Sequence, residues 1–375
     1  MTQIDNKKAG LTIPCHWDKQ VIEKIVSQQG DLKVTEVYGA LSEGGPVGHG
    51  RSKDSVKNVS KDEAVVFREW LAAMGLDFTY LLNAPFKFTD EKQKEDVKDY
   101  IRWVTGELKP NAVTVTSLEL MELVRQMDAG IDIHISTIAS VRNDRDLEKF
   151  QAVKPNRVVP HHDCGKRWEY LKGITDFGKK NGIETELLAT ESCIFQCPIR
   201  DVHYVYLSEQ SGDEKFHTNC NSRKILNPRE FLLAGGTIRP EDLGFYEGMG
   251  VNYFKITGRS KPATWLPEVT KAYIERKYEG NLIRLLGIDP SLKAEEWIYI
   301  DNKSLDGFIE GFPQTGIRED ENRYADEWMI KLYENNEFKL LDGTKYITEN
   351  NELKLKEIGD RSERIIENEF KIRMR

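Results

Sequence analysis

Long apolar runs are missing from this chain. No segment approaches the roughly 20 consecutive apolar residues that span a bilayer, and the first residues, MTQIDNKKAGLTIPCHWD, lack the apolar centre of a signal peptide. We therefore expect a cytoplasmic protein with no membrane partner. Cysteines are also scarce, at five among 375 residues. An odd number in a reducing compartment predicts thiols or metal ligands rather than a disulfide framework.

An excess of positive charge is absent as well, since the formal net charge is −8. Nucleic-acid binding needs clustered Lys and Arg against phosphate, so the acidic balance argues against a nucleic-acid partner, tRNA included, although a local basic groove stays open. No GxSxG elbow of a serine hydrolase occurs. The glycine-rich stretch GGPVGHGR (44–51) matches neither GxGxxG nor a phosphate-binding loop. We interpret it as a flexible loop after the second strand.

A regular alternation of strand-like and helix-like runs organises most of the chain. Strands are predicted at 11–15, 34–41, 76–84, 112–117, 131–137, 156–162, 183–193 and 251–259. Amphipathic runs lie between them, such as 60–75, where Ser60 and Glu63 fit a capping box and Gly75 a C-terminal stop. Such alternation predicts parallel strands with crossover helices. Eight units predict an α/β fold, a (β/α)8 TIM-type barrel.

The strand–helix rhythm is lost after about residue 285. We expect the barrel over 1–285, with a long insertion between strands seven and eight, and a small appended C-terminal α/β segment over 286–375 packed on it. The last residues, LKLKEIGDRSERIIENEFKIRMR, mix charges densely, which is typical of a solvated helix.

The five cysteines are all predicted at the same end of the barrel. Cys15 ends strand one, Cys164 follows strand six, Cys193 ends strand seven, and Cys197 and Cys220 lie in the insertion after it. All five therefore lie on the C-terminal face, where barrels carry their active sites. Thiolates gathered there suit an iron–sulfur cluster. Zinc completed by His203 or His217, metal-free thiols, and a nucleophilic cysteine stay open as alternatives.

Longer motifs resemble those of peptidase family U32, called collagenase-like. They are ELLATESCIFQCPIRDVHY (186–204), TNC (218–220), IRPEDLGFYEGMGVNYFKITGR (238–259), EVYGAL (36–41), GHGR (48–51), TYLLNA (79–84), ISTIASV (135–141) and YEGNLIRLL (278–286). The resemblance covers most of residues 10 to 310 and implies a barrel. It also implies an iron–sulfur protein that hydroxylates without molecular oxygen, as relatives do on the ubiquinone ring or a tRNA uridine, with prephenate as oxygen donor.

The expected function is therefore that of an iron–sulfur-dependent oxidoreductase that performs oxygen-independent hydroxylation, or a related modification, of a small, aromatic or peptide substrate. The alternatives are a peptidase or hydrolase, as the family name says, or a zinc-binding or non-catalytic barrel that works beside a paralogous partner protein.

The resemblance also implies a ligand set. Cys193, Cys197 and Cys220 map onto cysteines that hold a four-iron, four-sulfur (4Fe-4S) cluster, with Cys164 as the expected fourth ligand and Cys15 as the alternative. A three-cysteine cluster with one open iron stays possible. Two departures from the family pattern are HHDCGKRW after strand six, where relatives carry an Asn-Arg-Asp turn, and the lack of further cysteines near FPQTGIREDENRYADEW. A second metal site is therefore not expected.

Charged residues near the cysteines and at strand ends complete the predicted site. Catalytic candidates are Glu191, Arg200, His203, Lys255 and Arg259, and substrate-binding candidates are Arg51 and Arg239. Basic groups at strand ends pair well with a carboxylate such as those of prephenate. Glu241 and Asp242, just after Arg239, are interpreted as a helix start. His161 and His162 are expected on opposite faces of strand six, so that only one joins Cys164.

Overall fold

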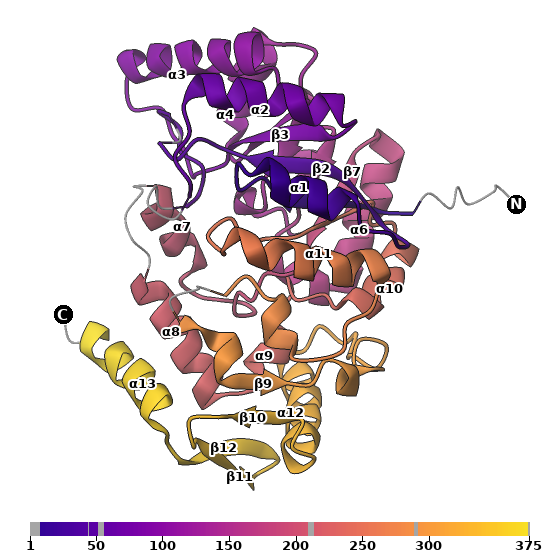
Figure 1. The fold of residues 1–375 in the computed structure, drawn as a ribbon, viewed down its shortest axis with the longest axis vertical. Coiled ribbons are helices and arrows are strands. Elements are labelled where there is room, and N and C mark those ends of the chain that lie inside the picture. Colours follow the sequence, from indigo (N-terminus) through magenta and orange to yellow (C-terminus); the bar gives the residue numbers. More distant parts are fainter. Residues whose placement is uncertain (1–7, 44, 52–55, 209–213, 289–291, 374–375) are drawn as a thin grey trace, which may run out of the picture.

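Eight parallel strands close into a barrel in the computed structural model, which describes residues 8–43, 45–51, 56–208, 214–288 and 292–373 (Figure 1). Each strand pairs with the next along the chain, and the last pairs with the first through Gly10 and Tyr253. The strands are β1 (Gly10–Pro14), β2 (Lys33–Gly39), β3 (Asp77–Leu82), β4 (Ala112–Val115), β5 (Asp132–Ile135), β6 (Arg157–Val158), β7 (Glu184–Leu188) and β8 (Tyr253–Lys255). The predicted TIM-type barrel is confirmed.

The sixth strand is much shorter than predicted, because pairing ends at Val158. His161 and His162 therefore do not alternate on a strand, and that prediction is wrong. His161 instead lies just before a short 3-10 helix, η5 (His162–Lys166), with its Nδ1 3.3 Å from the Asp163 backbone nitrogen.

Helices cover the outside of the barrel (Figure 1). They are α1 (Lys19–Val26), α2 (Lys61–Ala73), α3 (Glu91–Trp103), α4 (Leu118–Met127), α5 (Asp144–Glu148), α6 (Trp168–Asn181) and α11 (Leu266–Glu275). The predicted capping box is present at α2, where Ser60 Oγ accepts from the Glu63 N–H and Glu63 Oε2 accepts from the Ser60 N–H. Gly75, with φ of +73°, follows the helix end as predicted.

The insertion after β7 is mainly helical. It carries α7 (Arg200–Ser208), α8 (Glu214–Leu226), α9 (Glu230–Leu233) and α10 (Leu243–Gly248) before the chain returns to β8. This insertion carries Cys197 just before α7 and Cys220 within α8. Among the described residues, no helix combines the length and apolar character needed to cross a membrane.

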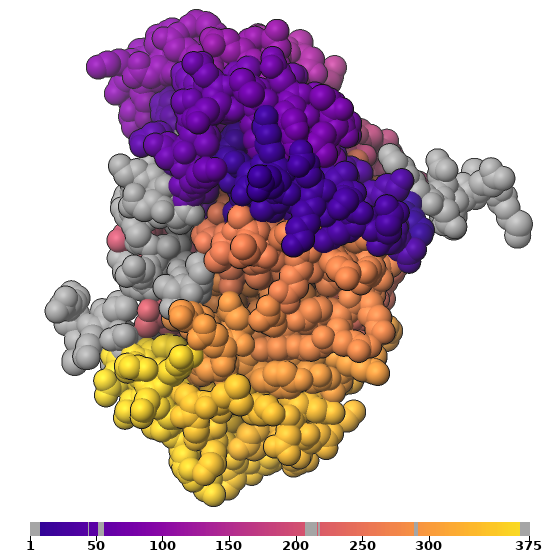
Figure 2. All heavy atoms as spheres, viewed as in Figure 1, coloured from indigo at the N-terminus to yellow at the C-terminus, as the bar shows by residue number. Residues whose placement is uncertain are grey.

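The C-terminal module, residues 292–373, includes the lower end of the molecule in the view of Figure 2. It packs against the insertion. Its elements are β9 (Ile298–Ile300), α12 (Arg318–Glu334), β10 (Phe338–Leu340), β11 (Lys345–Glu349), β12 (Glu352–Glu357) and α13 (Asp360–Arg373), with β9 paired to β10 and β11 to β12. The last residues do contain the predicted helix, α13, but they do not form one solvated helix throughout. They begin with β12, and α13 buries Ser362 and Ile366 as it packs against α8.

Candidate functional site

A cavity of about 150 Å³ opens at the C-terminal end of the barrel. Residues at the ends of several strands converge on it, which is the usual position of a barrel active site. Five predicted site residues line it, namely Arg51, Glu191, Cys193, Lys255 and Arg259, together with Tyr38, His162 and Tyr204.

Two arginines reach the cavity directly after glycines in the left-handed region. Gly50 has φ of +69° and precedes Arg51; Gly258 has φ of +122° and precedes Arg259. A Cβ at position 258 would lie 2.6 Å from the Trp265 ring, so both the backbone angle and the space require glycine there. The glycines thus turn the chain sharply where the arginine side chains enter the site.

Arg259 hydrogen-bonds to a neutral imidazole. Its guanidinium donates to His49 Nδ1 at 3.1 Å and to the His49 carbonyl oxygen at 2.7 Å. His49 Nε2 lies 2.9 Å from the Ser42 carbonyl oxygen, which fixes Nδ1 as the acceptor. Burial, together with the charge of nearby Arg51, lowers the pKa of Arg259 to about 10. The glycine-rich stretch forms a loop after β2, as predicted, and its residues 47–50 are buried rather than free in solvent, with His49 only 1% exposed.

Lys255 lies at the floor of the cavity and is buried. Its Nζ lies 3.5 Å from Glu186 Oε2 and 4.0 Å from the centre of the Tyr38 ring, and it makes no hydrogen bond within the described structure. Glu186 is fully buried and also accepts from Thr12. The Lys255 amine can therefore donate hydrogen bonds to an anionic group that enters the cavity.

Below Lys255 the barrel interior carries further charges. Arg157 NH1 lies 2.7 Å from Glu36 Oε2 and 3.9 Å from Glu186 Oε1. Lys255, Glu186, Arg157 and Glu36 thus alternate in sign, where barrels usually stack branched apolar side chains. Of these four residues, only Lys255 is a site residue predicted from the sequence.

Three cysteines of the insertion are electrostatic neighbours. Burial raises the pKa of Cys193 well above its ordinary value, and Glu191 and Cys220 raise it further. Burial also raises the pKa of Cys220 to about 11; Lys224 opposes this shift and Cys197 adds to it. Cys220 therefore lies within electrostatic range of both Cys193 and Cys197.

Two buried cations accompany this group. Arg200 is 4% exposed and Lys224 is 2% exposed, and both act on Cys193 and Cys220 in the direction that favours thiolates. Lys224 is not among the site residues predicted from the sequence, although the sequence carries a signal for it. It follows Cys220 by four residues on α8, a spacing that places two side chains on one helix face.

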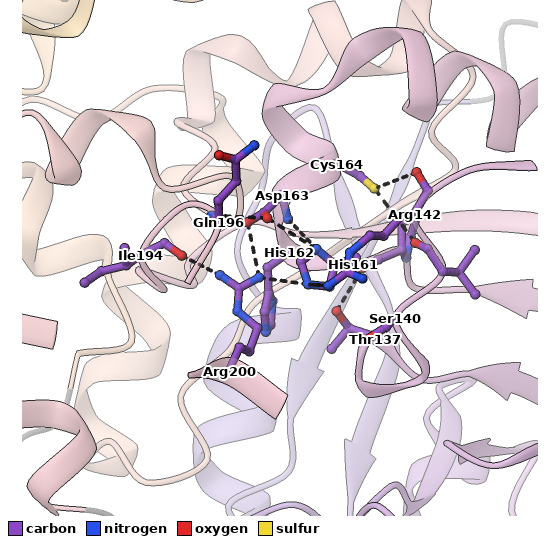
Figure 3. Close-up of polar contacts among 12 residues, drawn as sticks. Thr137, Ser140, Arg142, His161, His162, Asp163, Cys164, Ile194, Gln196 and Arg200 are labelled. Carbon is purple, nitrogen blue, oxygen red and sulfur yellow. Dashed lines mark hydrogen bonds and ion pairs between the residues drawn. The ribbon is translucent and has the colours of Figure 1, made fainter. Parts of the chain in front are cut away.

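Cys164 and Cys15 occupy different surroundings from this group. The Cys164 thiol is directed at the carbonyl oxygens of Val141 and Arg142, at 3.8 and 3.6 Å (Figure 3). It lines an outer pocket of about 290 Å³ that Cys197 also lines. Cys15 is buried beside Gly39, and burial raises its pKa to about 12. Of the two expected fourth ligands, the structure brings only Cys164 to a pocket shared with another cysteine.

Arg200 is held by residues of the segment after β6. Its guanidinium donates to His161 Nε2 at 3.0 Å and pairs with Asp163 Oδ1 at 3.2 Å (Figure 3). Burial lowers the pKa of His161 to about 4, so this imidazole is neutral near pH 7. Arg200 therefore joins the cysteine segment to η5 and does not line the barrel cavity.

His203 and Arg239 also lie away from the cavity lining. The His203 ring stacks on Phe216 with centroids 4.4 Å apart, and His217 lies outside the residues whose side chains are described. Arg239 binds Asp242 with two nitrogens, at 3.0 and 2.8 Å, and donates to the Asn302 carbonyl oxygen at 2.6 Å. Arg239 thus ties the barrel to the C-terminal module. Among the described side chains, no three of His, Cys, Asp or Glu are grouped as a single metal ion requires.

Fold and site together define a TIM-type barrel with a polar cavity at its C-terminal mouth and cysteines in the insertion beside it. The model of peptidase family U32 matches residues 44–280, more than half of the chain, and the chain belongs to this family.

Two similar proteins carry names of the same family or activity. An uncharacterized protease of Methanocaldococcus jannaschii is 30% identical over 226 residues, which cover 56% of this chain and 64% of that protein. The chain thus spans less than two thirds of that relative. The solved structure of the U32 peptidase Mk0906 is 12% identical, covers 69% of this chain and 96% of its own, and superposes with a TM-score of 0.47.

Proposed function

We propose that this protein is an iron–sulfur-dependent oxidoreductase whose metal centre adjoins a small-molecule cavity at the barrel mouth. The observation that carries the proposal is that Cys193 adjoins both the cavity and Cys220. It lines the cavity, and it is an electrostatic neighbour of Cys220, which in turn neighbours Cys197. A cluster on these thiols would therefore be within reach of a substrate in the cavity.

The donor chemistry fits such a cluster. Thiolates are the ligands that iron–sulfur clusters use, and the buried cations Arg200 and Lys224 would offset part of their negative charge. A single zinc ion needs its ligands around one point, whereas a cluster distributes its cysteines over several irons. Cys193, Cys197 and Cys220 would hold the cluster, and the outer pocket shared with Cys197 favours Cys164 over Cys15 as a fourth ligand.

The cavity favours a small anionic substrate. Its volume of about 150 Å³ is close to that of an engineered cavity that binds benzene, so it suits a single ring or a molecule of similar size. Lys255 and Arg259 present positive charge there, and the described contacts of Arg259 are to His49. Oxygen-independent hydroxylation, with a carboxylate such as prephenate as oxygen donor, is the specific reaction that we propose.

The chain's own residues would bind and orient the reactants. Arg259 can hold a carboxylate with two parallel hydrogen bonds, and Lys255 can hold a second anionic group. Glu191 Oε1 accepts from the Cys193 thiol at 3.6 Å, and its Oε2 lies 3.7 Å from Arg51. That carboxylate is placed to accept a proton at the cavity wall. When bound, an iron–sulfur cluster supplies single-electron transfer, or Lewis acidity through an open iron.

The peptidase alternative rests on the names of the family and of its relatives. A nucleophilic cysteine needs a lowered pKa, and burial raises the pKa of both Cys193 and Cys220. The raised pKa values argue against attack on a peptide bond by these two thiols, and they leave metal ligation open because a coordinating metal deprotonates the thiol that it binds.

Anaerobic purification tests the proposal. We expect a brown protein with absorbance near ~400 nm and about four iron and four sulfide per chain. Stoichiometric zinc without sulfide would refute it in favour of the zinc alternative. Specific peptide cleavage by the metal-free protein would refute it in favour of a peptidase.

A further inference from the structure

Phe195, midway between Cys193 and Cys197, is buried against two guanidinium groups. The ring is 1% exposed. The guanidinium carbon of Arg167 lies 4.9 Å from its centre, and that of Arg318 lies 4.7 Å from it. Arg167 follows η5 after the sixth strand, whereas Arg318 is the first residue of α12 in the C-terminal module. Three segments far apart in the sequence thus meet at one aromatic ring.

Each guanidinium is anchored by a buried carboxylate. Arg167 forms an ion pair with Glu321, which is fully buried. Arg318 lies 3.3 Å from Glu230 Oε1, and Glu230 is 2% exposed. Burial lowers the pKa of both arginines, and a cation–π contact strengthens when the cation is desolvated. Arg318 and Glu321 both belong to α12. This helix therefore supplies one of the two guanidinium groups at Phe195 and the carboxylate that anchors the other.

The other residues between the cysteines are fixed as well. The Ile194 carbonyl oxygen accepts a hydrogen bond from Arg200, and the Gln196 N–H donates to Asp163 Oδ2 at 3.2 Å. Gln196 adopts a φ of +52°, a backbone conformation that persists only where the surroundings hold it. The spacing of Cys193 and Cys197 therefore depends on contacts made by Ile194, Phe195 and Gln196.

We infer that the C-terminal module braces the cysteine segment, with Arg318 and Arg167 acting as positioning residues through Phe195. The purpose of this brace rests on the proposed function: it would hold Cys193 and Cys197 in the positions that cluster binding requires before the cluster binds. It gives the module a role at the site although, among the described residues, none of its side chains lines the cavity.

Thiol labelling of the metal-free, full-length protein tests the brace. Phe195→Leu keeps an apolar side chain but removes the π face, and Arg318→Gln removes the cation. We expect each to raise the labelling rates of Cys193 and Cys197 about tenfold, as loss of a buried cation–π contact releases the segment locally. The rate at Cys15, buried at the end of β1, reports global unfolding and is expected to stay constant.

Arg229→Gln is the matched control. Arg229 joins α9 to the C-terminal module through Asp326 and Glu352, at 2.6 and 3.2 Å, without contacting Phe195. Equal increases in the labelling rates of Cys193 and Cys197 in all three variants, or no increase in any of them, would refute the inferred brace. The same variants carry a second readout, since Phe195→Leu and Arg318→Gln should retain less iron than Arg229→Gln. Wild-type protein without iron or sulfide would refute the proposed function. The labelling rates of the variants relative to wild type would still show whether the C-terminal module braces the cysteine segment.

Discussion

The Nζ of Lys255 lies 3.5 Å from Oε2 of Glu186, inside a barrel whose interior would ordinarily be apolar. Glu186 is fully buried and lies between this amine and Arg157. The carboxylate is thus shared by two cations, one of which faces the cavity. This arrangement holds a positive charge at the cavity floor without exposing it to bulk water.

Removing that carboxylate is expected to destabilise the fold. Glu186→Leu leaves Lys255 without an ionic partner and weakens the environment of Arg157, and breaking a buried ion pair typically costs about 3–5 kcal/mol. Urea denaturation measures the loss. Glu184→Gln is the control, because Glu184 also pairs with Arg157 but its side chain is 40% exposed, so a loss below about 1 kcal/mol is expected. Similar losses in the two variants would contradict the importance of the buried pair.

Lys255→Met is expected to weaken the binding of small carboxylates in the cavity. A hydrogen bond to a charged group contributes about 1.5–3 kcal/mol, so affinity should fall by roughly ten- to hundredfold. Isothermal titration with prephenate, and with a panel of small dicarboxylates, measures the change. Lys271→Met serves as control, since Lys271 pairs with Glu275 on the exposed face of α11. Unchanged affinity in Lys255→Met would exclude this amine from anion binding.

Local sequence signals predicted the barrel because they act over a few residues. The capping box of Ser60 and Glu63 and the stop at Gly75 depend only on neighbours in the chain, and all are present. Details that depend on tertiary packing were less accurate. The apolar spacing in DKQVIEKIVSQQG (18–30) predicts one buried helix face that includes Ile22, Ile25 and Val26. On α1, Ile22 and Ile25 are buried, whereas Val26 is 38% exposed. The sixth strand also stops before His161, where η5 turns the chain.

The candidate site was predictable where its residues come from strand ends. Arg51, Glu191, Cys193, Lys255 and Arg259 were predicted and do line the cavity. The partners of Arg239 were not readable, since Asn302 and Asp306 lie 63 and 67 residues further along the chain. Glu186 could not be predicted as a site residue for a similar reason. No local sequence pattern indicates that one charged residue in an apolar strand contacts a lysine of another strand inside the barrel.

Acid should destabilise the protein through buried neutral histidines. Burial lowers the pKa of His49 to about 4, with Arg259 adding to the shift, from an ordinary value of 6.5. The unfolded chain therefore binds a proton that the folded chain does not between these values. Stability is complete above pH 6.5, falls as the pH drops toward 4, and loses no more from this group below that. Between pH 7 and 5 the loss from one such histidine is about 2 kcal/mol.

His49→Asn isolates this contribution, because Asn offers an acceptor near the position of Nδ1 but does not titrate. Urea denaturation at pH 7, 6 and 5 should give a pH-dependent loss that is smaller by about 2 kcal/mol in the variant. His161, with its pKa also lowered to about 4 by burial, would account for part of the loss that remains. An identical slope in wild type and variant would contradict a neutral His49.

Cysteine substitution separates the metal ligands from the buried thiols. Cys193→Ser, Cys197→Ser and Cys220→Ser should each lose most of the iron after anaerobic purification, because each removes a soft ligand from one connected group. Cys15→Ser should retain it, since Cys15 is enclosed beside Gly39. Cys164→Ser decides between the two forms of the site: lost iron means a fourth cysteine ligand, whereas full iron means a three-cysteine cluster with an open position. Equal iron in all five variants, measured against folding by circular dichroism, would refute the ligand assignment.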